Sequence, residues 1–329
     1  MGSTIIGTGS YLPEKVLTNM DLEKMVDTSD EWIVTRTGIK ERRICPMDMA
    51  SSDLGVEAAK KAISDAGINA EEIDMIICAT ITADMHFPST ACIIQSKLGL
   101  DDIACFDISA ACSGFIYALE LARNFIDKGR YKKILVIAAE CMSRVTDYTD
   151  RSTCVLLGDG AAAAVVSYSE DEFGIIDSYL GSSGKYGNIL YLPAGGSKLP
   201  ASYETVSNRL HFMKMEGSTL FKIAINAMAK AIKKISERNN IHSNDISLLI
   251  PHQANIRIIQ GVAKLMDFSM DRVFVNIEKY GNMSAASVGV ALDEAVKSGR
   301  IHKGDLICMV SFGAGLTWAS NLIRWGKND

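Results

Sequence analysis

Two stretches of this 329-residue chain repeat the same order of helix, turn and strand, and this duplication limits the folds that the chain can adopt. Residues 52–80 read as an amphipathic helix, an acidic turn and a buried strand, and residues 220–254 follow the same plan. Aligning the two copies places Ile73 on Ile246. The sequence therefore predicts a fold made of two related units.

A second pair of similar segments strengthens this interpretation. Residues 113–140 and 284–313 each contain a helix, a Gly-Arg exit, a basic turn and an apolar strand. Aligning the Gly-Arg pairs gives an offset of 170 residues, which places Asn282 on Cys112. Both residues lie just ahead of a predicted helix, so we expect them at equivalent positions of the two units.

Alternating strand-like and helix-like segments predict an α/β fold with two related halves. We place these halves at residues 1–172 and 173–329, because the apolar strand at 161–167 ends just before this boundary. Beyond it, residues 181–200 are rich in glycine and small side chains. We expect this segment to form a functional loop or a tunnel wall.

Charge and composition exclude several classes of function. The net charge is -5 and the pI is near 5.6, so no global basic field attracts nucleic acid or an anionic membrane. Apolar runs end well before the ~20 residues of a membrane helix. The first residues lack the basic region of a secretory signal, and we expect a cytoplasmic protein.

Cofactor signals are weak throughout the chain. The eight cysteines and five histidines show no metal-ligand spacing, so we expect no metal. Gly7-Thr8-Gly9 resembles part of a dinucleotide-binding motif, but no third glycine follows and no helix begins there. We therefore expect no bound nicotinamide cofactor.

Cys112 is the strongest candidate nucleophile. It lies between the strand-like segment 103–108 and a predicted helix. The N-terminus of a helix favours a thiolate over a thiol, which would activate this cysteine. The alternative is a buried structural cysteine packed among alanines.

Three further sites could support such a nucleophile. His252 ends a buried strand-like run, where a general base or hydrogen-bond donor is expected in an α/β protein, although a structural histidine is the alternative. Asn282 is either an active-site amide or a Gly-Asn turn residue. Glycines flank Ala314, so backbone N–H groups there either face a reacting oxygen or simply form a tight turn.

Taken together, these motifs resemble the β-ketoacyl-acyl carrier protein synthase III family of condensing enzymes. The matching motifs are AACSGF at 110–115, PHQAN at 251–255, GNMSAAS at 281–287 and FGAGLTW at 312–318. The resemblance spans essentially the whole chain. It implies a thiolase-like fold in which the two duplicated α/β halves form α-β-α-β-α layers.

The resemblance implies an acyltransferase that starts type II fatty-acid synthesis. Cys112 would take the acyl group of a short acyl-CoA, acetyl-CoA in the first instance, and malonyl-acyl carrier protein would then lose carbon dioxide and condense with it. His252 and Asn282 would bind the thioester oxygen as an enolate forms. The backbone N–H groups of Cys112 and Ala314 would form a second oxyanion hole. Acyl-CoA would be a substrate, so no cofactor is expected.

The family also implies contacts away from the reacting sulfur. Coenzyme A would contact Thr28, Trp32, Arg36, Arg151, Gly217 and Asn255, with the adenine held between Trp32 and Arg151. The primer pocket would be shaped by Phe87, Met142, Leu156 and Phe312, with Phe87 reaching across a homodimer interface. A basic patch for the acidic carrier protein would contain Lys222, Arg257 and Lys264. Some relatives extend this patch with a lysine where this chain has Leu265.

Three other functions use parts of the same pattern. A related enzyme could pass the acyl group from Cys112 to oxygen, nitrogen or another carbon acid. A cysteine hydrolase could use Cys112, His252 and Asn282, but AACSGF does not match the protease signatures and those enzymes lack this duplication. A silent acyl-binding protein would be expected to have lost a catalytic residue, and none is lost here.

The identities of the side chains in the predicted pocket do not determine whether acetyl, branched or longer primers are preferred.

Overall fold

Each copy of the repeat forms one β-sheet of the computed structural model, which describes residues 2–327. The first sheet has the strand order β1-β7-β6-β4-β5 and the second has the order β8-β13-β12-β11. The first sheet contains β1 (Gly2–Tyr11), β7 (Asp159–Ser169), β6 (Lys133–Cys141), β4 (Met75–Ala79) and β5 (Ala104–Ile108). The second sheet contains β8 (Gly174–Ser182), β13 (Thr317–Arg324), β12 (Leu306–Gly313) and β11 (Leu248–Pro251).

The strand pairing confirms the duplication. Strands β4 and β6 are parallel neighbours, and so are β11 and β12, which the sequence alignment pairs with them. The next two pairings in each sheet, β6-β7-β1 and β12-β13-β8, are all antiparallel. The halves differ at one edge, where β5 in the first sheet corresponds to a single parallel bridge between Leu249 and Val273.

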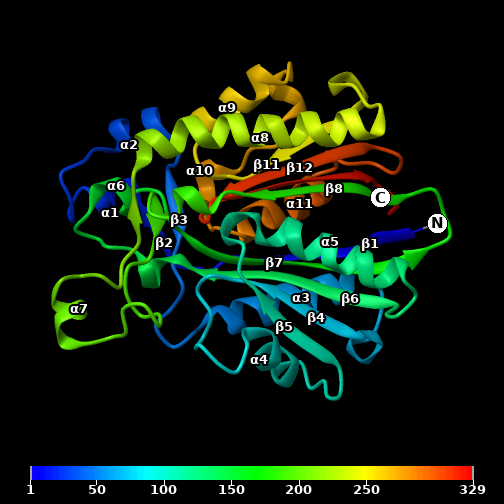
Figure 1. The fold of residues 1–329 in the computed structure, drawn as a ribbon, viewed down its shortest axis with the longest axis horizontal. Helices are drawn as coiled ribbons and strands as arrows, with labels where there is room; N and C mark the ends of the chain where they lie inside the picture. The colour runs from blue at the N-terminus through cyan, green and yellow to red at the C-terminus, as the bar shows by residue number, and fades with distance from the viewer. Residues whose placement is uncertain (1, 328–329) are drawn as a thin grey trace.

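Helices cover both outer faces and fill the space between the sheets (Figure 1). The outer face of the first sheet carries α3 (Ser51–Asp65) and α4 (Thr90–Lys97). The outer face of the second carries α8 (Gly217–Asn239) and α9 (Ile256–Leu265). Between the sheets lie α5 (Gly114–Asp127) and α11 (Ala286–Lys297). The predicted α-β-α-β-α layering is therefore correct.

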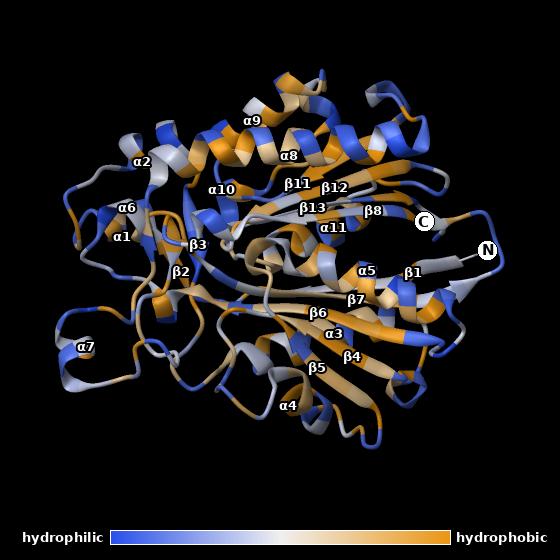
Figure 2. Ribbon diagram, viewed as in Figure 1, coloured by the Kyte–Doolittle hydropathy of each residue, from blue (hydrophilic) through white to orange (hydrophobic). Residues whose placement is uncertain are grey.

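Of the two central helices, α11 is the more deeply buried, because both of its faces meet a sheet. Every residue of α11 from Ala286 to Asp293 is buried, and most of them are small or apolar, as expected of a helix enclosed on all sides. Figure 2 shows hydrophobic residues along the central strands and polar residues in the outer loops. Both central helices begin at the end of the molecule where the candidate active-site residues lie.

Gly7 and Gly9 have a packing role in β1. A Cβ atom on Gly7 would lie 2.3 Å from the carbonyl oxygen of Ala62, and one on Gly9 would lie 2.4 Å from that of Ala58. Both alanines belong to α3, so the two glycines allow β1 and α3 to approach closely. This contact explains the Gly-x-Gly pattern without a dinucleotide.

Short elements surround the active-site end of the layers. They are β2 (Val16–Thr18), α1 (Asn19–Leu22), α2 (Asp30–Thr37), β3 (Glu41–Arg43), α6 (Arg151–Cys154) and α10 (Ile277–Tyr280). Arg42 joins them, because its fully buried guanidinium donates to Leu17 O at 3.0 Å and to Val155 O at 2.8 Å. The excursion between β8 and α8 adds β9 (Leu190–Tyr191), α7 (Tyr203–Ser207) and β10 (Lys214–Met215). Among residues 2–327, no helix has both the length and the apolar character needed to cross a bilayer.

Candidate active site

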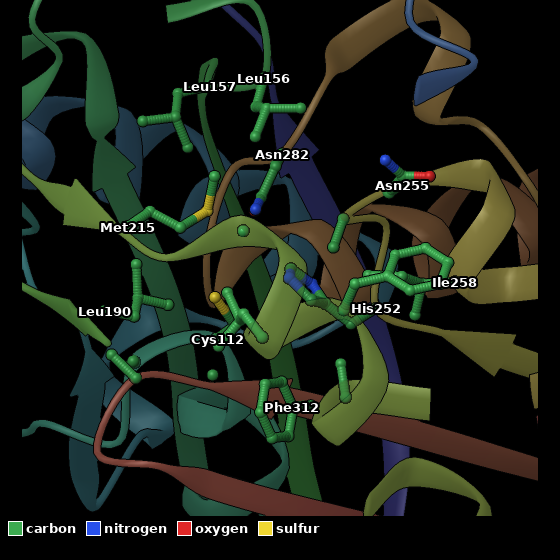
Figure 3. Close-up of a pocket in the computed structure, with 18 of the residues that line it drawn as sticks. Cys112, Leu156, Leu157, Leu190, Met215, His252, Asn255, Ile258, Asn282 and Phe312 are labelled. Atoms are coloured by element: carbon green, nitrogen blue, oxygen red, sulfur yellow. The ribbon is translucent and has the colours of Figure 1, made fainter. Parts of the chain in front are cut away.

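A cavity of about 190 Å³ lies where the two halves meet. It is far larger than the ~10–15 Å³ that one water molecule needs, so it is not a packing defect of the core. Figure 3 shows Cys112, His252 and Asn282 projecting into the same space. The structure thus brings together the three predicted catalytic side chains, which are far apart in the sequence. Other predicted residues in the lining are Met142, Leu156, Gly217, Asn255, Phe312 and Ala314.

Cys112 lies in a tight turn between β5 and α5. The turn includes a 3-10 segment, Ala111–Ser113, and Ala111 has a positive φ of 46°. Two hydroxyl groups from the second half hold this turn, because Ser311 Oγ donates to Cys112 O at 2.6 Å and Thr317 Oγ1 donates to Ala110 O at 2.8 Å. The nucleophile of one half is therefore positioned by the other half.

Burial dominates the acidity of the Cys112 thiol. The side chain is 8% exposed, and burial raises the pKa of the thiol to about 12, while the nearby Ser284 hydroxyl lowers it in part. The predicted position before a helix is correct, but the expected preference for a thiolate is not, since desolvation outweighs it. Because its pKa is raised, the thiol holds its proton more firmly than a free cysteine does, and its attack as a nucleophile would need a proton acceptor.

His252 is a neutral imidazole. It follows β11 and is 2% exposed, and burial lowers the pKa of its imidazole to about 3. Its backbone N–H donates to Val310 O at 2.8 Å, which fixes the residue beside β12. Its Nδ1 atom is buried and makes no hydrogen bond within residues 2–327. A neutral imidazole can donate one N–H to an oxygen without placing a full charge in the cavity.

Asn282 has a fixed orientation. Its Oδ1 atom accepts a hydrogen bond from the backbone N–H of Ser284 at 2.9 Å, so its Nδ2 donor is left to face the cavity. The backbone on both sides is tied to the first half, since Asn282 N–H donates to Leu156 O at 2.8 Å and Gly158 N–H donates to Asn282 O at 3.0 Å. Asn282 precedes α11 as Cys112 precedes α5, as the repeat predicts.

The glycine-rich segment after β12 packs directly against Cys112. A Cβ atom on Gly313 would lie 2.5 Å from the backbone nitrogen of Cys112 and 3.0 Å from its Cβ. The next residue, Ala314, lines the cavity, and its φ is not positive, so an alanine fits this backbone without strain. The lack of a side chain at Gly313 thus lets the segment before Ala314 approach the backbone of Cys112. That the N–H groups of Cys112 and Ala314 share an oxyanion hole stays a prediction.

Comparison with known proteins gives the family. Residues 106–184 match the family model of 3-oxoacyl-[acyl-carrier-protein (ACP)] synthase III, and residues 236–325 match the model of its C-terminal part. The β-ketoacyl-[acyl-carrier-protein] synthase III of Caldanaerobacter subterraneus subsp. tengcongensis is 57% identical over 323 residues, which covers 98% of both chains. The chain belongs to the synthase III family. It is a condensing acyltransferase with a thiolase-like fold.

Other relatives agree with this assignment. The synthase III of Clostridioides difficile is 53% identical over 98% of both chains. The crystal structure of the synthase III from Aquifex aeolicus VF5 has a TM-score of 0.91 and 48% identity, covering 98% of this chain and 100% of that one. The structure from Pseudomonas aeruginosa PAO1 has a TM-score of 0.92 and 36% identity, with full coverage of both chains.

In this synthase III, two arginine side chains lie over the ring of Trp32, which is outside the cavity lining. The guanidinium carbons of Arg36 and Arg151 are each 4.8 Å from the centroid of the Trp32 ring. Arg151 Nη1 also donates to Asp27 O at 2.7 Å. The slot expected between Trp32 and Arg151 is closed by their direct stacking, so an adenine that entered it would have to separate them.

The other residues predicted to contact coenzyme A differ in whether they already make hydrogen bonds within the protein. Gly217 begins α8 and lines the cavity, and Thr28 Oγ1 is buried without a hydrogen bond to the rest of residues 2–327. Asn255 also lines the cavity, but it caps α9 by accepting from Arg257 N–H at 2.9 Å and donates to Arg36 O at 3.0 Å. Both the oxygen and the nitrogen of its carboxamide therefore already make hydrogen bonds within the protein.

Of the four residues predicted for the primer pocket, three line the cavity and one does not. Met142, Leu156 and Phe312 are in the lining. Phe87 is outside it and is 85% exposed on the loop between β4 and α4. Its predicted role in a neighbouring subunit's pocket therefore stays a prediction.

The predicted carrier-protein patch lies on two helices that pack together at the surface. Lys222 is on α8, and Arg257 and Lys264 are on α9, and all three side chains are exposed. Arg257 lies 5.4 Å from the ring centroid of Phe221, a residue of the cavity lining. The positive surface thus adjoins the cavity.

Sequence reasoning missed two kinds of residue. The first kind is the apolar lining, such as Leu190, Met213 and Met215, which comes from the excursion between β8 and α8 and carries no motif. The second kind is polar and lies behind Cys112, namely Glu140 and Ser284, both of which are fully buried. Glu140 could have been found from the sequence, because it is a charged residue at the end of an apolar strand.

Proposed function

We propose that this chain starts fatty-acid synthesis by joining a short acyl group from acyl-CoA to malonyl-acyl carrier protein. The observation that carries this proposal is the convergence of a cysteine, a neutral histidine and an oriented asparagine in one cavity of a synthase III. Acetyl-CoA is the primer that we propose first.

In the first half-reaction, Cys112 Sγ attacks the thioester carbon of the acyl-CoA. The negative charge that develops on the carbonyl oxygen is stabilised by the backbone N–H groups of Cys112 and Ala314. Gly313 permits this arrangement because it leaves no side chain between the two backbone segments. Coenzyme A then leaves as a thiolate, and the acyl group stays on Cys112.

In the second half-reaction, malonyl-acyl carrier protein occupies the same cavity. The His252 imidazole and the Asn282 Nδ2 group donate to the thioester oxygen, and each such donor contributes roughly 3 to 4 kcal/mol to an oxyanion-like transition state. Carbon dioxide leaves, and the resulting carbanion attacks the acyl carbon on Cys112. The mostly apolar lining supports this step, because it keeps water away from the carbanion.

The surface supports two proposed partners. The exposed Lys222, Arg257 and Lys264 give an acidic chain a local positive patch, which suits an acidic carrier protein. A homodimer is supported by large exposed hydrophobic side chains near the active-site end, among them Met85 and Phe87. We further propose that the enzyme works in the cytoplasm, where both substrates would be met.

The test is to incubate the protein with acetyl-CoA that is radiolabelled in the acetyl group and to map the label by peptide analysis. We expect label on Cys112, and addition of malonyl-acyl carrier protein should move it to a β-ketoacyl product. Absence of label from Cys112 would sink the proposal. Release of free acetate would indicate a hydrolase, and label on an alcohol or amine acceptor would indicate a relative with another acceptor. A panel of longer and branched acyl-CoA primers then defines the primer range.

A further inference from the structure

A second, larger hollow adjoins the catalytic cavity. Its volume is about 720 Å³, against about 190 Å³ for the cavity, and it is open to the surface, where Met85 in its lining is 51% exposed. Among residues 2–327, only Ile81 lines both spaces. Its side chain is 37% exposed, although isoleucine is a residue of protein cores. The two spaces therefore meet at this side chain.

The strand order explains why Ile81 lies beside the nucleophile. It follows β4, which lies between β5 and β6 and runs parallel to both. Cys112 follows β5, and Met142 comes directly after β6. Because the carboxyl ends of parallel strands meet at one edge of a sheet, the three residues are neighbours there, and all three line the cavity.

Elsewhere, the wall between the cavity and the outer hollow is made of backbone. Met142 lines the cavity, while the preceding residue, Cys141, lines the hollow. In the same way, Leu190 lines the cavity and Leu192 lines the hollow. At these places the chain itself separates the two spaces. At Ile81 one residue faces both, so its side chain is the thinnest part of the wall.

A buried carboxylate holds the backbone around Ile81. Glu140 is fully buried and accepts from the Ile81 N–H at 3.2 Å, from Thr82 Oγ1 at 2.6 Å and from Thr80 Oγ1 at 3.3 Å. The carbonyl oxygen of Thr82 also accepts from Ser51 Oγ at 2.6 Å. Three successive residues are thus fixed, and a β-branched side chain such as isoleucine is stiff about its first torsion. The wall therefore yields little to a substrate that presses on it.

We propose that the Ile81 side chain sets the longest acyl group that Cys112 can carry, because it closes the cavity toward the outer hollow. This role rests on the proposed function, since the acyl group is the one that acyl-CoA delivers to Cys112. A short group such as acetyl ends before the wall, whereas the far end of a long group would need the space that Ile81 fills. One methylene group too many in a closed pocket changes the rate by roughly 10- to 200-fold.

The outer hollow can accept an acyl chain once the wall is shortened. Its lining includes the apolar side chains of Met49, Val145 and Leu192. Its two carboxylates already have backbone partners, since Asp84 accepts from the N–H of Ser52 at 2.9 Å and Asp107 accepts from that of Thr90 at 2.7 Å. A smaller residue at position 81 would therefore join the cavity to a space several times larger.

The test measures Cys112 acylation by acetyl-, butanoyl-, hexanoyl- and octanoyl-CoA in single turnovers, by quenched flow and intact-protein mass. Each rate is divided by the acetyl rate of the same variant. In the unsubstituted protein the octanoyl rate should be lower than the acetyl rate by about 100-fold or more. Ile81→Ala should raise the octanoyl ratio by at least roughly tenfold. Ile81→Val should raise the butanoyl and hexanoyl ratios by less, and it covers the case in which Ile81→Ala does not fold.

Two further variants separate the wall from a general enlargement of the cavity. Leu220 lines the cavity from α8, in the other half, and does not line the outer hollow. Leu220→Ala removes an apolar side chain of similar size and should leave the ratios unchanged. Ala83 is exposed and lines only the outer hollow. Adding Ala83→Trp to Ile81→Ala should refill the hollow and cancel the gain with octanoyl-CoA.

The assigned role of Ile81 is overturned if the unsubstituted protein takes octanoyl as fast as acetyl, or if Ile81→Ala leaves the octanoyl ratio unchanged. It is equally overturned if Leu220→Ala raises that ratio as much, or if Ala83→Trp leaves the gain intact. Failure of every acyl-CoA to acylate Cys112 in the unsubstituted protein would refute the proposed function itself, which is a separate outcome.

Discussion

The backbone N–H of Ser284 donates to Oδ1 of Asn282 at 2.9 Å and so decides which end of the Asn282 carboxamide faces the cavity. An asparagine that is free to rotate would present its oxygen half of the time, and an oxygen would repel the enolate. Figure 3 shows the amide nitrogen of Asn282 on the side of the cavity. This bond links the orientation of the amide to the conformation of the turn before α11.

Asn282→Asp should keep the bond from Ser284 N–H but replace the Nδ2 donor with a carboxylate oxygen. We expect decarboxylation of malonyl-acyl carrier protein to fall by roughly 10²- to 10³-fold, because an oxyanion donor has been lost and a like charge added. Release of labelled carbon dioxide measures this. Acylation of Cys112 should change much less, and an equal loss of both steps would contradict the assigned role.

Cys112→Ala and His252→Ala should separate the two half-reactions. Cys112→Ala should stop condensation and leave some decarboxylation, since His252 and Asn282 still face the thioester oxygen. His252→Ala should accept an acetyl group on Cys112 and lose decarboxylation. Intact-protein mass and carbon dioxide release report the two steps independently. If both folded variants lost both steps equally, the division of roles would be wrong.

Gly313→Ala should damage the nucleophile without replacing a catalytic residue. The added Cβ would lie 2.5 Å from Cys112 N, so the backbone must shift. We expect acylation to fall by about 100-fold, because small displacements of reacting atoms carry such costs. Gly184→Ala is the control, as its Cβ would meet nothing within 4 Å. Similar acylation rates in the two variants would show that the contact is unimportant.

Trp32→Ala should weaken the use of acyl-CoA at the mouth. The guanidinium groups of Arg36 and Arg151 lie over the ring, and a proposed adenine site there depends on this aromatic side chain. We expect KM for acetyl-CoA to rise roughly tenfold with little change in kcat. The KM for malonyl-acyl carrier protein serves as the internal control. A change in kcat alone would place Trp32 outside the coenzyme A site.

Glu140→Gln should change how the stability of the protein depends on pH. The pKa of Glu140 rises from 4.5 to about 7 on folding, so the folded state keeps this proton longer than the unfolded state does. Stability of the unsubstituted protein therefore falls as pH rises from about 4.5 to about 7, and the Gln variant lacks this loss. Relative to the unsubstituted protein, the variant should gain about 3 kcal/mol of unfolding free energy between pH 4 and pH 8. Urea unfolding at both pH values measures the difference, and a pH-independent difference would contradict the shift.

The sequence was sufficient to predict the duplicated architecture, because the repeat is carried by apolar periodicity and by the Gly-Arg helix exits. It also predicted that Cys112 and Asn282 occupy equivalent positions, since both follow from one alignment offset. His252 could be predicted as a candidate from its position at the end of a buried strand. Each of these features is a pattern within a short segment of the chain, so it can be recognised from the amino-acid sequence alone.

Other properties depend on what surrounds a residue in three dimensions. The acidity of Cys112 was predicted in the wrong direction, because its helix position is visible in the sequence and its burial is not. Glu140 and Ser284 were missed, since the strand and the turn that carry them meet only in the fold. The stacking of Arg151 on Trp32 joins residues that are far apart in the chain, and no motif predicts that it closes the slot.

The hydroxyls of Ser311 and Thr317, which hold the carbonyl oxygens of Cys112 and Ala110, have a consequence for inheritance. The exposed acidic turn at 170–172 is the natural place for a genetic crossover between two relatives. Such a crossover would combine a nucleophile turn from one parent with its hydroxyl supports from the other. Although the halves are built to one plan, they are therefore expected to be inherited together, and chimaeras should lose acylation before they lose the fold.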